Sequence, residues 1–121
     1  MQSQIIKAKP MEEYYFDEGC FILELSNSSA DPTVSIARAT VKPGVTTKLH
    51  CLTGVIERYV ILSGCGLVEI AGLPKQELAP GDVVVIPPEY AQRISNQSDS
   101  DLIFLAICTP RFTPECYLSL E

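Results

Sequence analysis

Histidine, tryptophan and positive charge are scarce in this chain. Of its 121 residues one is histidine, His50, none is tryptophan, and nine lysine and arginine residues stand against fifteen acidic ones, for a formal net charge of −6. A metal centre built mainly of imidazole ligands needs two or three histidines, which a single chain cannot supply here. The few, scattered basic residues would not attract a phosphate backbone or an anionic membrane surface. We therefore expect neither nucleic acid nor a membrane among its partners.

Long hydrophobic runs are also missing. No stretch comes near the roughly 20 apolar residues that a helix needs to cross a bilayer. The first residues include lysines and acids but neither an apolar core nor a small-residue cleavage site, so we expect a cytoplasmic protein. The five cysteines are odd in number and form no C-x-x-C pair. This favours reduced thiols over disulfides, with several of them filling the core.

What the sequence contains instead is a series of short runs rich in β-branched and other apolar residues. Turn-forming clusters separate the runs, and nine prolines along the chain discourage long helices. Regular spacing of this kind predicts an all-β fold, an antiparallel sandwich or barrel, in one domain of residues 1–121. The tail from Pro110 onward fits a terminal strand, an arm across a partner subunit or one turn of helix. The predicted strands cover residues 20–25, 33–41, 57–62, 66–70, 82–86, 91–94 and 102–109.

The first of two motifs occupies residues 44–64. Gly44 is followed after five residues by His50, after one more by Leu52, after four more by Glu57, and after six more by a second glycine. This spacing resembles the first motif of the cupins, in which glycine, two histidines one residue apart, glutamate and glycine follow one another at these distances. Here leucine stands at the second histidine position.

The second motif occupies residues 81–96 and resembles the second cupin motif, which reads glycine, proline, glycine, histidine and asparagine at fixed spacing. The first glycine, Pro87 and Asn96 hold their positions, whereas Glu89 replaces the second glycine and Gln92 replaces the histidine. The resemblance implies a cupin-type double-stranded β-helix, a jelly-roll barrel, over nearly the whole chain, with short irregular segments at both ends. It says less about activity, because this fold hosts many unrelated reactions.

Cupin motifs normally give three histidines and one glutamate to a divalent metal. His50 and Glu57 hold two of these positions, Gln92 stands at a third, and the fourth is lost at Leu52. The resemblance therefore implies a weakened metal site of His50, Glu57 and Gln92 that holds manganese, iron(II), nickel or zinc loosely. Water or a chelating substrate would fill the remaining positions. The alternative is that no metal binds and that His50 only forms a hydrogen bond to Glu57 or Gln92 within the pocket.

Strand geometry predicts a pocket by a separate argument. Alternate residues of a strand share a face, so His50 and Leu52 point to one side and Cys51 to the other. Three polar groups against an apolar wall are typical of a ligand pocket, in which Tyr59 and Leu52 would contact the ligand. The side chains expected inside the barrel are His50, Leu52, Glu57, Tyr59, Gln92 and Ile94.

Other side chains are weaker candidates. Arg38, on the strand before the first motif, contacts an anionic ligand in one interpretation and pairs with a surface acid in the other, which we favour. Cys108 is either a thiol at the mouth of the barrel or an inert buried thiol, and we favour the second. A solvated acidic cluster is expected at Glu12, Glu13, Asp17 and Glu18.

Three functions follow from these observations. The first is an enzyme, a small cupin with a weakly held divalent metal that acts on a small polar molecule as a dioxygenase, isomerase or lyase, with Glu57 as ligand or base. Oxygen activation fits least, because a non-haem iron oxygenase commonly needs two histidines and a carboxylate on one face. The second is a metal-free module that binds or senses a small molecule, and the third is assembly alone. The first is slightly favoured, since an inward carboxylate at Glu57 is costly without a metal, cation or hydrogen-bond partner.

The oligomeric state follows from the sheet edges. A small antiparallel barrel has edges to cover, and dimerisation covers them. We expect a two-fold homodimer that uses the N-terminal strand and the C-terminal tail.

Overall fold

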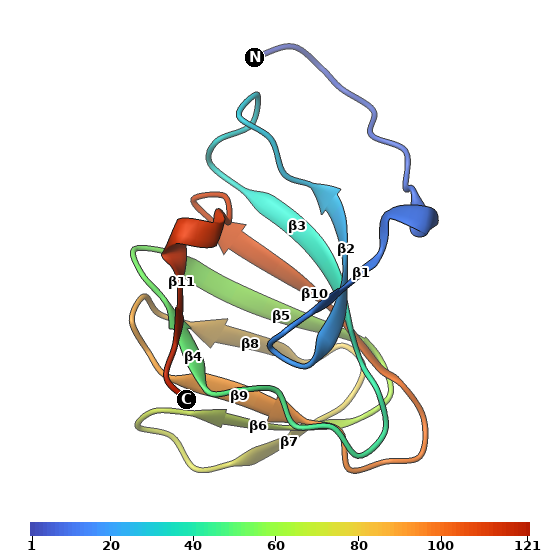
Figure 1. Cartoon of the computed structure of the whole chain (residues 1–121), viewed down its shortest axis with the longest axis vertical. Helices are drawn as coiled ribbons and strands as arrows, with labels where there is room; N and C mark the ends of the chain where they lie inside the picture. Colours follow the sequence, from blue (N-terminus) through green and yellow to red (C-terminus); the bar gives the residue numbers. More distant parts are fainter.

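Two antiparallel sheets pack against each other in the computed structural model, which describes all residues from 1 to 121 (Figure 1). Six strands form one sheet in the order β1-β2-β3-β10-β5-β8, and five form the other in the order β11-β4-β9-β6-β7. The predicted all-β jelly-roll fold is confirmed. The first sheet comprises β1 (Tyr14–Phe16), β2 (Cys20–Ser26), β3 (Ser35–Val41), β10 (Leu102–Thr109), β5 (Ile56–Ser63) and β8 (Val83–Ile86). The second comprises β11 (Tyr117–Ser119), β4 (His50–Leu52), β9 (Gln92–Ser95), β6 (Gly66–Ile70) and β7 (Gln76–Leu78).

The strand-forming runs of the sequence become strands with small changes at their ends. Each of the predicted runs contains a strand, and β10 matches its predicted run at both ends. The strands that composition did not predict, β1, β4, β7 and β11, have three residues each. So short a segment contains too little alternation to be recognised from its sequence.

The C-terminal tail forms a strand preceded by one turn of 3-10 helix. The turn, η2 (Pro114–Cys116), leads into β11, which pairs with β4 of the same chain and places Ser119 opposite His50. A second 3-10 turn, η1 (Pro10–Glu12), precedes β1. Neither turn, and no other part of the structure, is a helix of the length and apolarity that a membrane crossing requires.

The core lies between the two sheets and takes side chains from both. Gly64 allows the close approach at the β5–β6 hairpin, since its φ is +81° and a Cβ there would collide with the carbonyl oxygen of Asp101. Four of the five cysteines are buried, and all five are free thiols. The main cluster of buried residues is Cys20, Ala39, Val41, Tyr59, Ile61, Val68, Ile70, Leu78, Val84, Ile86, Ile94, Leu102 and Phe104.

Candidate functional site

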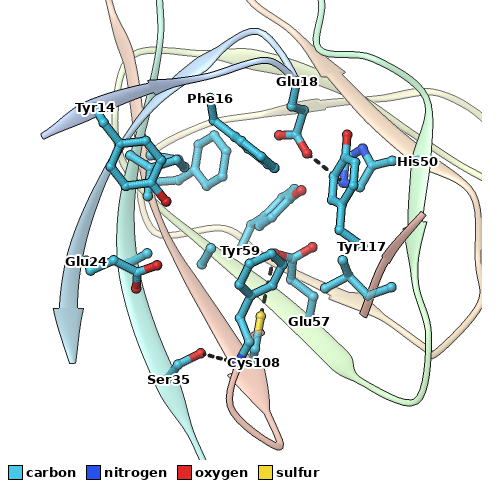
Figure 2. A pocket seen from close by; sticks show the side chains of 17 residues that line it. Tyr14, Phe16, Glu18, Glu24, Ser35, His50, Glu57, Tyr59, Cys108 and Tyr117 are labelled. Atoms are coloured by element: carbon cyan, nitrogen blue, oxygen red, sulfur yellow. Dashed lines mark hydrogen bonds and ion pairs between the residues drawn. The ribbon is translucent and has the colours of Figure 1, made fainter. Parts of the chain in front are cut away.

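A cavity lies inside the barrel between strands of both sheets (Figure 2). Its walls come from β1, β2, β3, β5 and β10 of the first sheet, from β4 and β11 of the second, and from the β1–β2 turn. Twelve of the 17 lining residues are hydrophobic, a mixture typical of small-molecule pockets. The volume open to the centre of a water molecule is about 60 Å³, enough for roughly four to six waters. The cavity therefore suits a small molecule.

Glu57, near the start of β5, is the buried acid of this cavity. The residue is 8% exposed. One carboxylate oxygen accepts a hydrogen bond of 2.9 Å from Gln92 Nε2, and the other accepts from the Cys108 thiol at 3.7 Å. Burial raises the pKa of Glu57 to about 7, and the negative charge of Glu18 adds to the shift. A carboxyl group with this pKa populates both protonation states near neutral pH and can give or take a proton.

His50 is held between two oxygen atoms. Its Nδ1 lies 2.8 Å from the carbonyl oxygen of Lys48, which can only accept, so Nδ1 carries a proton. Its Nε2 lies 3.0 Å from a carboxylate oxygen of Glu18. Burial lowers the pKa of His50, but the hydrogen bond to Glu18 and the charge of Glu18 raise it more, and the net shift is upward. His50 and Glu18 therefore form a buried ion pair in which both imidazole nitrogens are engaged.

The backbone closes this pair into a ring of three contacts. The Lys48 N–H donates to the Glu18 carbonyl oxygen over 2.8 Å, and the Lys48 carbonyl accepts from His50. Glu18 is thus fixed to the segment before β4 through both its backbone and its side chain. Tyr117 of β11 stacks on the imidazole, with ring centroids 5.0 Å apart and an interplanar angle of 18° (Figure 2).

Gln92 on β9 lies behind the cavity wall and holds two lining residues in place. It is 1% exposed. Its Nε2 donates to Glu57, and its Oε1 accepts a hydrogen bond of 2.5 Å from the Tyr59 hydroxyl. The amide oxygen, which is the atom that a metal would need, therefore faces the phenol of Tyr59.

These contacts test whether the residues fit the metal that the cupin motifs imply. The candidate donor atoms of His50, Glu57 and Gln92 are each engaged by a neighbouring protein group. The chain has no group of three or more histidine, cysteine, aspartate or glutamate side chains arranged to hold a metal. The arrangement therefore fits a satisfied hydrogen-bond network and does not fit a metal held by this set of residues.

The structure brings most of the predicted inward residues together. His50, Leu52, Glu57 and Tyr59 line the cavity, Gln92 supports it from behind, and Ile94 belongs to the core. Cys108 also lines the cavity, and burial raises the pKa of its thiol, so the thiol is protonated at neutral pH. This agrees with an inert thiol.

Arg38 lies outside the cavity. Its neighbours on β3, Ala37 and Ala39, face inward, so alternation turns Arg38 to the other face, where it pairs with Glu13 at 3.2 Å. This corrects its assignment as a ligand contact in favour of the surface ion pair.

Glu18 and Tyr117 are two of the lining residues that the sequence did not reveal, and both contact His50. Glu18 was expected in a solvated cluster, yet its side chain is only 12% exposed. The turn at Gly19, with φ of +114°, brings it over the barrel between β1 and β2. Gly19 is the one signal that predicts a turn at this point, and it does not predict the direction of the carboxylate.

Comparison with known proteins identifies the family. Residues 37–108 match the family model of the cupin domain. The chain is 32% identical over 117 residues to an uncharacterized protein of Methanocaldococcus jannaschii, and the match covers 95% of this chain and 90% of that protein.

Solved structures show the same fold at low sequence identity. KdgF from Halomonas sp. superposes with a TM-score of 0.77 and 16% identity, over 90% of this chain and 96% of that one. Pac13 of Streptomyces, a nucleoside dehydratase studied with uridine, gives 0.79 and 14%, over 98% and 93%. Bacillus subtilis oxalate decarboxylase gives 0.78 and 23%, over 92% of this chain and 30% of that one. Since the family model covers more than half of the sequence, this chain belongs to the cupin family.

Proposed function

We propose that this protein binds a small polar molecule in its cavity and transfers a proton to or from it, as a lyase or isomerase that needs no resident metal. The observation that carries the proposal is Glu57, a carboxyl group that is 8% exposed and has a pKa of about 7, in the wall of the cavity. General acid–base catalysis is most effective when the pKa of the acting group lies near the working pH.

The other polar groups supply position. Gln92 fixes one oxygen of Glu57 by its hydrogen bond, which leaves the other oxygen near the weakly donating Cys108 thiol. The imidazole of His50 also lines the cavity, and its pairing with Glu18 fixes the ring in place.

One structural neighbour supports this reaction class by analogy. Pac13 is a nucleoside dehydratase, and loss of water from a substrate is a lyase reaction that depends on proton transfer. The likeness lies in the fold, so the support concerns what a barrel of this shape can house and does not identify a substrate.

A cupin with a weakly held divalent metal is the second candidate. Two of the four usual cupin positions, His50 and Glu57, are retained and line one cavity. Manganese, iron, nickel or zinc would have to displace Glu18 from His50 or share the site with it, because Nε2 already faces that carboxylate. This cost is the reason for placing the metal-free function first.

Metal analysis and a ligand screen on protein purified without a nickel column test both candidates. The proposal expects substoichiometric metal and an unchanged melting temperature when manganese, iron, nickel or zinc is added. It also expects stabilisation by a small polar molecule, which Glu57→Ala abolishes and the exposed control Glu77→Ala on β7 preserves. Near-stoichiometric metal that is lost in His50→Ala would replace the proposal by the second candidate. Turnover of the ligand so found separates an enzyme from a metal-free sensing module.

A further inference from the structure

The charges around the cavity are almost all negative. Three carboxyl groups line it, those of Glu18, Glu24 and Glu57, and Figure 2 shows them on three sides of the open space. His50 is the single basic side chain in the lining, which includes no lysine and no arginine. A carboxylate or phosphate ligand would therefore enter without a positive partner of its own.

The internal pairing neutralises the charge of Glu18 and leaves Glu24 and Glu57 without a positive partner. His50 is committed to Glu18 at 3.0 Å. Glu57 is contacted only by an amide and a thiol, and neither it nor Glu24 forms an ion pair within the chain. A buried carboxylate without a cation is costly, so the cavity favours the entry of one positive charge.

Aromatic rings form much of the remaining wall. The face of an aromatic ring carries negative potential and attracts an ammonium group within about 6 Å. Two of the rings, Phe16 and Tyr117, meet edge to face with centroids 5.1 Å apart, and Tyr59 packs against Phe104 at 4.4 Å. The rings that line the cavity are those of Tyr14, Phe16, Tyr59, Phe104, Phe112 and Tyr117.

The pKa shifts of two phenol groups indicate the same negative potential. Burial raises the pKa of Tyr59 and of Tyr117, and in both residues the carboxylates of the cavity raise it further. Their surroundings thus disfavour added negative charge and favour a cation.

We propose that the ligand of this cavity is a small organic cation, a primary or methylated amine. Its ammonium group lies against the aromatic wall near Glu57, and Glu24 at the mouth adds attraction. The proposal rests on the proposed function, because it names the chemical class of the molecule that the same cavity binds. The volume of about 60 Å³ limits the buried part of the cation to about four to six non-hydrogen atoms, the size of a trimethylammonium group.

Matched probes test the charge of the ligand. Ethanolamine and choline are the cations, 3,3-dimethyl-1-butanol is the neutral isostere of choline, and acetate and propionate are the anions. Calorimetry and thermal shift on the full chain should show that choline binds about tenfold more tightly than its neutral isostere, as expected for a desolvated cation over aromatic faces. The anions should not bind.

Two variants separate the effect of charge at the cavity from the effect of the protein's net charge. Glu24→Gln should weaken choline binding several-fold without changing the fold, because Glu24 lies at the exposed rim of the cavity. Glu77→Gln removes the same charge from the exposed face of β7 and should leave binding unchanged.

The outcomes distinguish the assignment of a cationic ligand from the proposal that the cavity binds a small molecule at all. Equal binding of choline and its neutral isostere, or binding of the anions, would overturn the cation assignment while leaving the small-molecule site in place. An absence of binding by every probe, cationic, neutral and anionic, would remove the site together with its assignment.

Discussion

The two halves of the barrel interior differ, although the same strands build both. Along the inward face of β5, Glu57 and Tyr59 line the cavity, whereas Ile61 lies in the packed core at 1% exposure. On the neighbouring β10, Ala106 and Cys108 line the cavity, and the other end of the strand is buried in the core. One half is filled mainly by alkyl side chains, while the other combines aromatic, small and polar side chains around an open space. Stability and chemistry are thus divided along the strands.

The largest effect is expected in the packed half. Ile61→Ala removes a side chain that is 1% exposed and should lower the free energy of unfolding by about 2–5 kcal/mol. Urea unfolding followed by circular dichroism measures this loss. Ligand binding by the fraction that stays folded should be unchanged, because Ile61 does not line the cavity. Loss of binding in a folded variant would break the division between the two halves.

In the cavity half, substitution of Glu57 is expected to raise the free energy of unfolding instead of lowering it. Its pKa of about 7 lies above the ordinary value of 4.5, so the folded state holds this proton more tightly than the unfolded state. The resulting stability is present below pH 4.5 and is lost as the pH rises through 7, a loss of about 3 kcal/mol. Glu57→Gln should remove this loss and make the chain more stable than the original at pH 8.

Urea unfolding at pH 5 and pH 8 measures this effect for both proteins. The original chain should lose stability between the two values, and Glu57→Gln should lose much less. The same pH dependence in both proteins would show that Glu57 titrates normally, and the acid–base proposal would fail with it. A gain in stability on removal of a functional group is the usual sign that an active site is kept at the expense of stability.

A smaller effect is expected at the His50–Glu18 pair. Glu18→Gln removes the carboxylate that raises the pKa of His50 while burial still lowers it, so the pKa of His50 should fall from its raised value. The pair stabilises the fold at low pH, and this contribution is lost as the pH rises through the folded-state pKa of His50. Below that pKa, Glu18→Gln should lower the free energy of unfolding by about 2 kcal/mol.

Nuclear magnetic resonance follows this change without ambiguity, since the chain has one imidazole. Glu13→Gln is the matched control, because Glu13 pairs with Arg38 outside the cavity. A pKa for His50 that is the same in Glu18→Gln and in the original chain would contradict the ion pair.

The smallest effect on stability is expected outside both halves, in the N-terminal segment. Figure 1 shows this segment extending away from the barrel, and Ile5 and Ile6 on it are 87% and 54% exposed. We predict a homodimer in which a second copy of the chain covers these side chains. The double substitution of Ile5→Ser and Ile6→Ser should give a monomer, and the free energy of unfolding of a single copy should change by no more than about 0.5 kcal/mol.

Sedimentation at micromolar concentration measures the mass of each form. Leu73→Ser, at an exposed position between β6 and β7, is the control that should remain dimeric. A monomeric mass for the unchanged chain would refute the prediction.

The fold was predictable from the sequence because long runs carry their own pattern. Seven of the eight residues of β10 are apolar and the run is bounded by turns, and the resemblance of the two motifs to those of the cupins implied the barrel type. Spacing also placed His50, Leu52, Glu57 and Tyr59 on inward faces, as the cavity shows. These properties depend on local periodicity, which a sequence displays directly.

The rest of the site depends on contacts between distant segments. Glu18 reaches His50 through a turn 32 residues earlier in the chain, and Tyr117 reaches it through the pairing of β11 with β4. The amide of Gln92 does not line the cavity, because Glu57 and Tyr59, both on another strand, engage its nitrogen and its oxygen. Spacing within a motif contains no information about such partners, so the ligand set implied by the motifs is incomplete.

The ring of contacts among Glu18, Lys48 and His50 restricts how the sequence can vary among relatives. Lys48 takes part through its backbone alone, so its side chain is free to drift between species. Positions 18 and 50 share one contact, so relatives that exchange the imidazole should exchange the acid as well. Among related sequences we therefore expect paired replacement at positions 18 and 50 and free variation at position 48.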